Sequence, residues 1–179
     1  MQVDNIFRIG SITKQFTGVA ILQLMEQGKL NLQDDITKFI PDYPVHGHHI
    51  TIEHLLTHTS GIQSDTNMND FSEKLTLDLK PSELINYFKN QPMEFAPGTN
   101  WKYNNSGYFL LGYIIEKVSG KTYQQYVEDN FFKHLGMSNS LYGSDSRIVK
   151  NRAGAYSKDS TGVINAHVMS MTIPYAAGS

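Results

Sequence analysis

The sequence predicts an α+β fold in which helices dominate and strands contribute little. The length of 179 residues is compatible with one domain, and a hydrophobic content of 40% is enough for a real core. Only residues 153–164, with Gly162 near a polar turn, have the pattern of a β-hairpin. Five other segments carry apolar residues at helical spacing, namely residues 13–27, 51–58, 81–90, 106–119 and 123–134.

The predicted helix at residues 13–27 is defined by one apolar stripe and a stop signal. Gly28 directly follows the pattern and is a natural helix end. The stripe consists of Phe16, Val19, Ala20 and Leu24, with Ile12 before them.

The later helices have recognisable starts or ends. Pro81 suits a first helical position, Thr122 can cap the helix that follows it, and Gly120 ends the apolar pattern of residues 106–119. Residues 62–80 show little periodicity, so we predict that they form a mobile surface insertion.

Composition excludes several function classes. A net charge of −2 without a basic run gives no case for nucleic-acid binding. No run of eighteen apolar residues is present, so no membrane span is predicted, and the start of the chain lacks the regions of a signal peptide. The absence of cysteine rules out disulfides, cysteine–zinc sites and a cysteine nucleophile.

The first candidate for chemistry is Ser11 with Lys14, in the stretch FRIGSITK. Residues three apart lie on one face of a helix, so the hydroxyl and the amine point the same way. A serine hydroxyl needs a neighbouring base to become a good nucleophile, and the start of a helix stabilises developing negative charge. With fifteen serines and twelve lysines, roughly one such spacing is expected by chance. The alternative is a serine N-cap beside a solvated lysine.

The second candidate is the triplet Tyr103-Asn104-Asn105. It lies between a turn at residues 97–99 and the helix predicted at residues 106–119. A loop in this position can project its side chains into a cleft. Trp101 and Tyr108 flank the triplet and either line that cleft or belong to the core.

With both motifs in view, the chain resembles the superfamily of serine β-lactamases and penicillin-binding proteins, above all its class C-like branch. That branch holds β-lactamases, D-aminopeptidases, DD-peptidases and esterases. The segments 29–41, 50–62 and 94–120 are also similar to family segments, in the same order. The resemblance implies a β-lactamase/transpeptidase-like fold, here mainly its helical part with little of the antiparallel sheet, and no cofactor.

The resemblance also implies roles for four residues. Ser11 corresponds to the nucleophile, Lys14 to its proton partner and Tyr103 to the general base. Asn105 resembles the residue that binds the substrate amide and orients Lys14. The implied substrate is a β-lactam, a D-amino-acid peptide related to peptidoglycan, or a small ester, and the implied location is the cell envelope or outside the cell.

The direction of proton transfer stays open at this point. Burial raises the pKa of a tyrosine and lowers that of a lysine, whereas a nearby ammonium favours phenolate. Either a cationic Lys14 makes Tyr103 the base, or a neutral Lys14 is the base and Tyr103 relays the proton.

A third family motif, Lys-Thr-Gly or His-x-Gly on an edge strand, is not found. Lys121-Thr122 is followed by Tyr123, and His167 is followed by Val168. We therefore expect residues 1–179 to be an internal portion of one longer domain. In the family, one of the two backbone amides that bind the oxyanion comes from this edge strand. Loss of one such donor typically lowers the rate by about a hundred- to a thousand-fold, so we expect this portion alone to be weakly active or inactive. We also expect it to self-associate through uncovered apolar helix faces.

Other groupings have simpler explanations. His46, His48 and His49 share a loop, but no carboxylate stands at ligand spacing, so no metal site is predicted. Asp34 and Asp35 are expected to cap a short helix. In His58-Thr59-Ser60-Gly61 we expect a helix end that is closed by the glycine.

The competing hypothesis for function is a non-catalytic penicillin-binding-protein-like protein that binds a ligand or acts as a scaffold. The presence of Ser11, Lys14, Tyr103 and Asn105 together favours the hydrolase, because a binding protein does not need all four.

Overall fold

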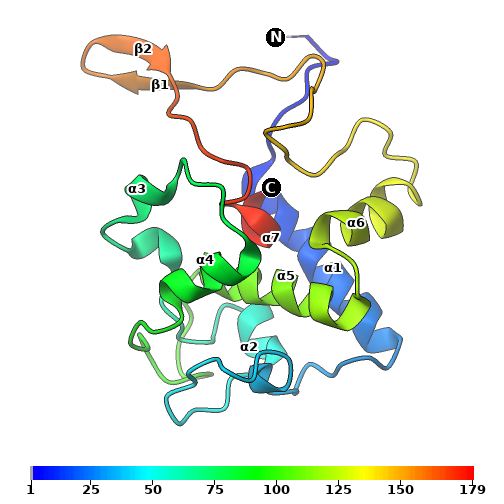
Figure 1. Ribbon diagram of the computed structural model, residues 1–179, viewed down its shortest axis with the longest axis vertical. Helices are drawn as coiled ribbons and strands as arrows, with labels where there is room; N and C mark the ends of the chain where they lie inside the picture. Colours follow the sequence, from blue (N-terminus) through cyan, green and yellow to red (C-terminus); the bar gives the residue numbers. More distant parts are fainter. Residues whose placement is uncertain (1) are drawn as a thin grey trace.

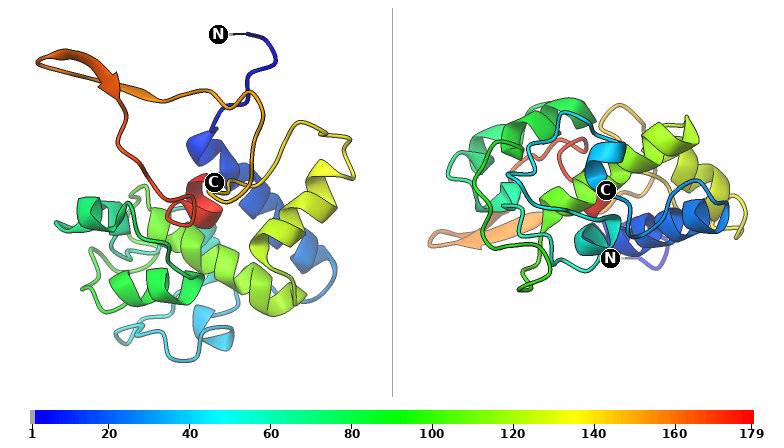
Figure 2. Two further views of the ribbon diagram at one scale, coloured as in Figure 1. Left: turned by 45° about the horizontal axis from the view of Figure 1, so that its top comes forward. Right: turned by 90° about the horizontal axis from the view of Figure 1, so that it is seen from below.

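The computed structural model describes residues 2–179 and is organised around two helices, α1 (Thr13–Glu26) and α5 (Asn105–Ser119), which pack against each other (Figure 1). The short helix α7 (Tyr175–Gly178) contacts both of them. Helices α2 (Ile52–Leu56) and α4 (Pro81–Phe88) pack on α5, and α6 (Tyr123–Val127) joins it from the other end (Figure 2). The C-terminal helix α7 thus lies against both central helices, close to the start of α1 (Figure 1).

Short elements complete the chain. A 3-10 turn, η1 (Gly10–Ile12), leads into α1, and two others are η2 (Ile36–Lys38) and η3 (Asp65–Asn67). Helix α3 (Phe71–Lys74) follows η3, and a π-helical turn, η4 (Glu128–Phe132), continues α6. Strands β1 (Tyr156–Asp159) and β2 (Gly162–Asn165) pair antiparallel, with Tyr156 opposite Asn165. This hairpin projects away from the helices (Figure 1).

The core is centred on α5. Leu110, Leu111, Ile114 and Ile115 of this helix are fully buried, as are Ala20, Ile21 and Leu24 of α1. Asn104 caps the start of α5, because its side chain accepts a hydrogen bond from the Gly107 amide, and the left-handed Gly120 (φ 72°) caps its end. Its start is therefore held by the second sequence motif itself.

A glycine allows α7 to approach α5 closely. A Cβ at Gly112 would lie 2.4 Å from Cβ of Ala176 and 2.7 Å from a ring carbon of Tyr175. Only a residue without a side chain fits at this contact, which fixes the position of residues 175–178.

The predicted α+β fold with dominant helices is confirmed, and the five predicted helices are present with shifted ends. Thr122 caps α6, and Asp35 caps η2 by accepting a hydrogen bond from the Thr37 amide, both as predicted. The predicted hairpin is confirmed at 156–165. The helix predicted at residues 123–134 is α-helical only to Val127 and then widens to the π-helical turn.

Two other predictions need correction. Residues 62–80 are not a surface segment throughout, because Ser64 and Asp65 are buried and the segment forms η3 and α3. Residues 66–80 are exposed or half-buried, as predicted. The end of α2 is not closed by Gly61. The first residue with left-handed backbone after α2 is His58 (φ 61°). Gly61 is left-handed as well (φ 71°), and a Cβ there would also collide with the Phe95 carbonyl.

In residues 2–179, no helix is both long enough and apolar enough to cross a bilayer. The same residues hold no cluster of three His, Cys, Asp or Glu side chains suited to a metal ion.

Candidate active site

Ser11 lies in the turn η1, just before α1, and its side chain is exposed to solvent. Lys14 lies one helical turn later on the same face, and its side chain is buried. Ser11 is exposed, whereas Lys14 is only 7% exposed. The helical spacing brings Lys14 Nζ to 3.4 Å from Ser11 Oγ. The amine of Lys14 therefore lies beneath the exposed hydroxyl of Ser11.

The second motif supplies two more groups from the loop before α5. The Tyr103 hydroxyl donates to Ser11 Oγ at 2.6 Å. Lys14 Nζ donates to Asn105 Oδ1 at 2.7 Å. The structure thus brings together Ser11, Lys14, Tyr103 and Asn105, which are separated by about ninety positions in the sequence.

Helix α7 adds an acceptor that the sequence did not suggest. The carbonyl oxygen of Ala177 accepts a hydrogen bond from Lys14 Nζ at 2.9 Å. Lys14 therefore has three acceptors, namely Ser11 Oγ, Asn105 Oδ1 and the Ala177 carbonyl. An ammonium group has three N–H donors, so this arrangement matches the cationic form.

Opposing effects act on Lys14. Burial lowers its pKa below the ordinary value, while Tyr103 and the negative charge of Asp65 act in the opposite direction. The amine also lies 4.6 Å from the ring centre of Tyr103 and 5.2 Å from that of Tyr108, where aromatic faces stabilise a cation.

The turn η3 and the residue before it, from the segment predicted to be mobile, form hydrogen bonds with Asn105 of the second motif and with Ser106. Ser64 Oγ accepts from the Asn105 amide at 3.2 Å, and Thr66 Oγ1 accepts from Asn105 Nδ2 at 3.4 Å. The Asp65 amide donates to Ser106 Oγ at 2.8 Å. Sequence reasoning missed these residues because their polar side chains follow no periodic pattern.

Asp65 is the most unusual charged residue near the site. Its side chain is only 1% exposed, and burial raises the pKa of its carboxyl to about 6. The Ser106 hydroxyl donates to the carboxylate at 3.4 Å, and the Lys14 charge partly offsets the effect of burial.

The two flanking aromatic residues differ in their surroundings. Tyr108 is buried and donates to the Leu56 carbonyl, whereas Trp101 is 62% exposed. Tyr108 therefore belongs to the core, although its ring also faces Lys14.

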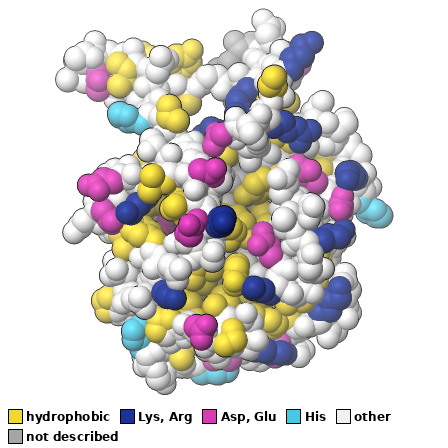
Figure 3. All heavy atoms as spheres, viewed as in Figure 1, with side chains coloured by type: hydrophobic (Ala, Val, Ile, Leu, Met, Phe, Trp, Pro, Cys, Tyr) yellow, Lys and Arg dark blue, Asp and Glu magenta, His cyan; other side chains and the backbone are white. Residues whose placement is uncertain are grey.

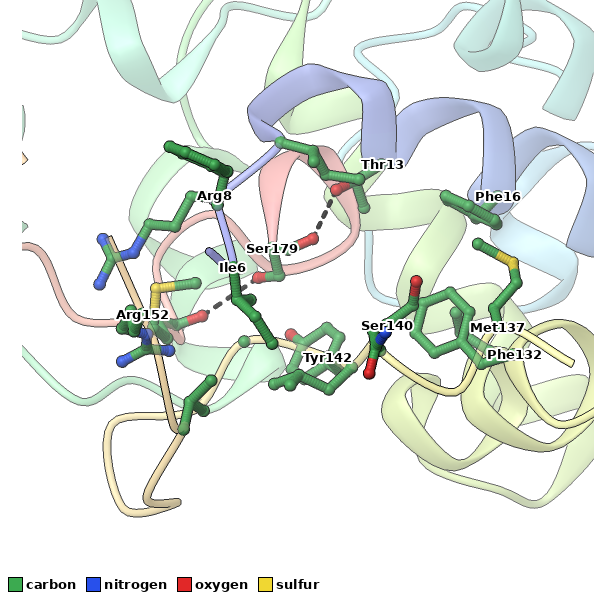
Figure 4. Close-up of a pocket in the computed structure, with 18 of the residues that line it drawn as sticks. Ile6, Arg8, Thr13, Phe16, Phe132, Met137, Ser140, Tyr142, Arg152 and Ser179 are labelled. Atoms are coloured by element: carbon green, nitrogen blue, oxygen red, sulfur yellow. Dashed lines mark hydrogen bonds between the residues drawn. The ribbon is translucent and has the colours of Figure 1, made fainter. Parts of the chain in front are cut away.

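A cavity lies away from the four motif side chains. It has a volume of about 310 Å³, and Thr13 and Phe16 of α1, Tyr142, and Arg8 with Arg152 help to line it (Figure 4). None of the four motif side chains lines this cavity. The cluster around Ser11 is instead an open surface site.

Three comparisons bear on identity. The sequence profile of the family described as Beta-lactamase matches residues 1–179. PbpX of Bacillus subtilis (strain 168), named as a penicillin-binding protein, is 33% identical over 172 residues, covering 96% of this chain and 42% of PbpX.

Two solved structures have the same fold. A penicillin-binding protein from Bacillus halodurans superposes with a TM-score of 0.84 at 32% identity, over 99% of this chain and 56% of that one. A D-stereospecific amidohydrolase from Streptomyces gives a TM-score of 0.83 at 33% identity, over 96% and 55%.

This chain spans about half the length of these relatives or less. The family match covers it from end to end, and the fold is that of β-lactamases and transpeptidases. The chain therefore belongs to the β-lactamase family, within the superfamily of serine β-lactamases and penicillin-binding proteins.

Proposed function

We propose that the full-length protein is a serine hydrolase or acyltransferase that forms an acyl-enzyme on Ser11. The observation that carries this proposal is the hydrogen bond of 2.6 Å between the Tyr103 hydroxyl and Ser11 Oγ, with Lys14 Nζ close to both groups. A hydroxyl in contact with a phenol and an amine has the proton acceptor that nucleophilic catalysis requires.

In the proposed reaction Tyr103, as phenolate, takes the proton of Ser11 while Oγ bonds to the substrate carbonyl carbon. The same proton then passes from Tyr103 to the leaving nitrogen or oxygen, and the bond to the leaving group breaks. Water repeats the sequence to hydrolyse the ester and restore Ser11, and in transfer an acceptor amine or alcohol replaces the water.

The surroundings of Lys14 support this assignment of the base. Its three acceptors suit an ammonium group, which has no lone pair to take a proton. The Tyr103 oxygen is then the group beside Ser11 Oγ that can accept its proton. The alternative, with neutral Lys14 as the base, is supported by burial, which lowers the pKa of Lys14. Both routes pass the proton through the Tyr103 hydroxyl, so both require it.

Asn105 is proposed to bind the substrate amide. Its Oδ1 is occupied by Lys14, and its Nδ2 makes a long hydrogen bond of 3.4 Å to Thr66 Oγ1, so Nδ2 can donate to a substrate carbonyl. The proposed substrate class is a β-lactam, a D-amino-acid peptide or amide, or a small ester. Two relatives support it by name, one as a penicillin-binding protein and one as a D-stereospecific amidohydrolase.

The test is covalent labelling of the full-length protein with a fluorescent penicillin and with a fluorophosphonate. We expect a stoichiometric mass increase on the peptide containing Ser11, and no labelling of Ser11→Ala. Ser160→Ala, in the exposed turn of the hairpin, is the matched control and should label like the wild type. An unlabelled wild type, or labelling that survives Ser11→Ala, would reject the proposal in favour of a non-catalytic binding or scaffold protein.

A further inference from the structure

His58 lies against the side chain of Tyr103, and the reaction described above gives it no role. The two ring centres are 4.7 Å apart with the ring planes inclined by 39°. His58 follows helix α2, so it belongs to a part of the chain that is remote in sequence from both motifs.

The residues on both sides of Tyr103 are also bonded to His58. The His58 carbonyl accepts from the Lys102 amide at 3.0 Å, and His58 Nδ1 accepts from the Asn104 amide at 3.2 Å. One residue therefore holds the backbone before and after Tyr103 while its ring supports the phenol.

We propose that His58 is a positioning residue that holds the Tyr103 hydroxyl at Ser11. This inference rests on the proposed function, because it concerns the same proton transfer. A displacement of about 1 Å in such a group can cost on the order of a hundredfold in rate. The contact of 2.6 Å between the Tyr103 hydroxyl and Ser11 Oγ depends on where the loop is fixed.

The geometry accounts for a histidine at this position. Its backbone is left-handed (φ 61°), a conformation in which Asn, Asp and His are several-fold enriched among non-glycine residues. Because Nδ1 accepts a hydrogen bond, the neutral ring carries its proton on Nε2. Asparagine can adopt the left-handed backbone and can accept the hydrogen bond from the Asn104 amide. Phenylalanine keeps an aromatic ring but has no acceptor. Alanine has neither a ring nor an acceptor.

Protonation of His58 would break this support. An N–H at Nδ1 would face the Asn104 amide N–H, and two donors repel. Burial, and then the charge of Lys14, lower the pKa of His58 below its ordinary value, so the ring stays neutral at physiological pH. The titratable groups that face it are Lys14 from α1, Tyr103 from the loop and Tyr108 from α5.

The experiment compares His58→Asn, His58→Phe and His58→Ala in the full-length protein by the rate and concentration dependence of penicillin labelling. We expect His58→Asn to acylate within about tenfold of the wild type. His58→Phe and His58→Ala should lose about a hundredfold in the acylation rate constant, with little change in the concentration for half-maximal rate. His48→Asn, in an exposed loop, should change nothing.

The pH profile distinguishes positioning from general damage. In the wild type, protonation of His58 and protonation of the base at Ser11 should both lower the acylation rate on the acid side. In His58→Asn only the fall caused by the base should remain, so the acid limb should become less steep. Wild-type rates in His58→Phe, or an unchanged acid limb in His58→Asn, would overturn the proposal.

Nitrogen-15 NMR of the histidine side chains tests the hydrogen bond from the Asn104 amide to His58 Nδ1 without relying on catalytic activity. We expect an unprotonated Nδ1 on His58 at pH 7.5 and a titration below the ordinary range. A proton on Nδ1 at that pH would overturn the proposal even if the other variants fail to fold. If the wild type is not labelled at all, the proposed function fails, and the histidine signals alone decide whether His58 accepts from Asn104.

Discussion

Buried charge beside the cluster makes stability depend on pH at the level of single residues. The Asp65 carboxyl has a pKa raised to about 6 by burial, above its ordinary value of 3.8. The folded state therefore binds this proton more tightly than the unfolded state does. Its contribution to stability is fully present below about pH 4 and is lost as the pH rises through about 6.

We expect Asp65→Asn to remove this dependence, because asparagine keeps the acceptor for Ser106 and does not titrate. The free energy of unfolding of the variant, relative to the wild type, should rise by about 3 kcal/mol between pH 4 and pH 7. Urea unfolding at several pH values measures it. Asp159→Asn is the contrasting control, because hydrogen bonds from Thr161 hold the pKa of Asp159 below its usual range. The free energy of unfolding of this variant, relative to the wild type, should fall as the pH rises. A difference for Asp65→Asn that is constant with pH would contradict the expectation.

The phenol of Tyr103 is the second feature that a single substitution tests. Tyr103→Phe keeps the ring against His58 and removes only the hydroxyl that contacts Ser11. A positioned general base typically contributes a factor of about 10² to 10⁴. We expect the acylation rate constant to fall by that factor in stopped-flow labelling, and Tyr156→Phe, exposed in the hairpin, to have no effect. A loss smaller than tenfold would contradict any role of the Tyr103 hydroxyl in moving the proton of Ser11.

At the scale of elements, Gly18 and Gly112 both lie inside helices but have different neighbours. Substituting each by alanine distinguishes the effect of helix propensity from the effect of side-chain packing. Replacing glycine by alanine inside a helix usually stabilises by about 0.5–1 kcal/mol. At Gly18 in α1 a Cβ would lie 3.9 Å from Leu56, an ordinary contact, so Gly18→Ala should stabilise. At Gly112 the new Cβ would collide with α7.

We therefore expect Gly112→Ala to destabilise by about 1–3 kcal/mol, the usual cost of overpacking. Displacement of α7 would also withdraw the Ala177 carbonyl from Lys14, so acylation should slow as well. Urea unfolding and labelling rates of the two variants provide the measurement. Equal stabilisation by both substitutions would show that α7 does not pack on α5 as described.

The elements also show which structures were predictable. Helices α1 and α5 were predicted at the right positions, but the apolar stripe predicted for α1 is only partly its buried side. Ala20 and Leu24 are buried, whereas Ile12 and Val19 are 55% and 46% exposed. The turn η3 was missed because Ser64 and Asp65 are held by contacts with Asn105 and Ser106, which come forty residues later. A local pattern cannot indicate a segment that only distant partners stabilise.

At the scale of the molecule, apolar side chains remain on the surface. Figure 3 shows them gathered among charged residues over the lower part of one face. On α1 and the turn before it, Ile12 (55% exposed), Val19 (46%) and Leu22 (41%) lie at spacings of seven and three, which places them on one side. Phe16, on the same stripe, lines the cavity of Figure 4.

We expect the 179-residue chain to self-associate through this side of α1, because contiguous exposed apolar surface favours contact between copies. Light scattering coupled to size exclusion measures the mass. The double substitution Val19→Gln with Leu22→Lys should shift it toward the monomer, whereas the pair Lys117→Gln with Lys121→Gln should not. A monodisperse monomer of the unsubstituted chain at all concentrations would contradict the expectation.

The helical elements, the spacing of Ser11 and Lys14, and the resemblance that named Tyr103 and Asn105 could all be read from the amino-acid sequence. They are local patterns, and a helix turns such a pattern directly into geometry. That His58, Asp65 and the Ala177 carbonyl surround the same groups became known from the folded chain alone. Such contacts join segments more than forty positions apart, and they form because burying α5 between α1, α2, α4 and α7 brings those segments together.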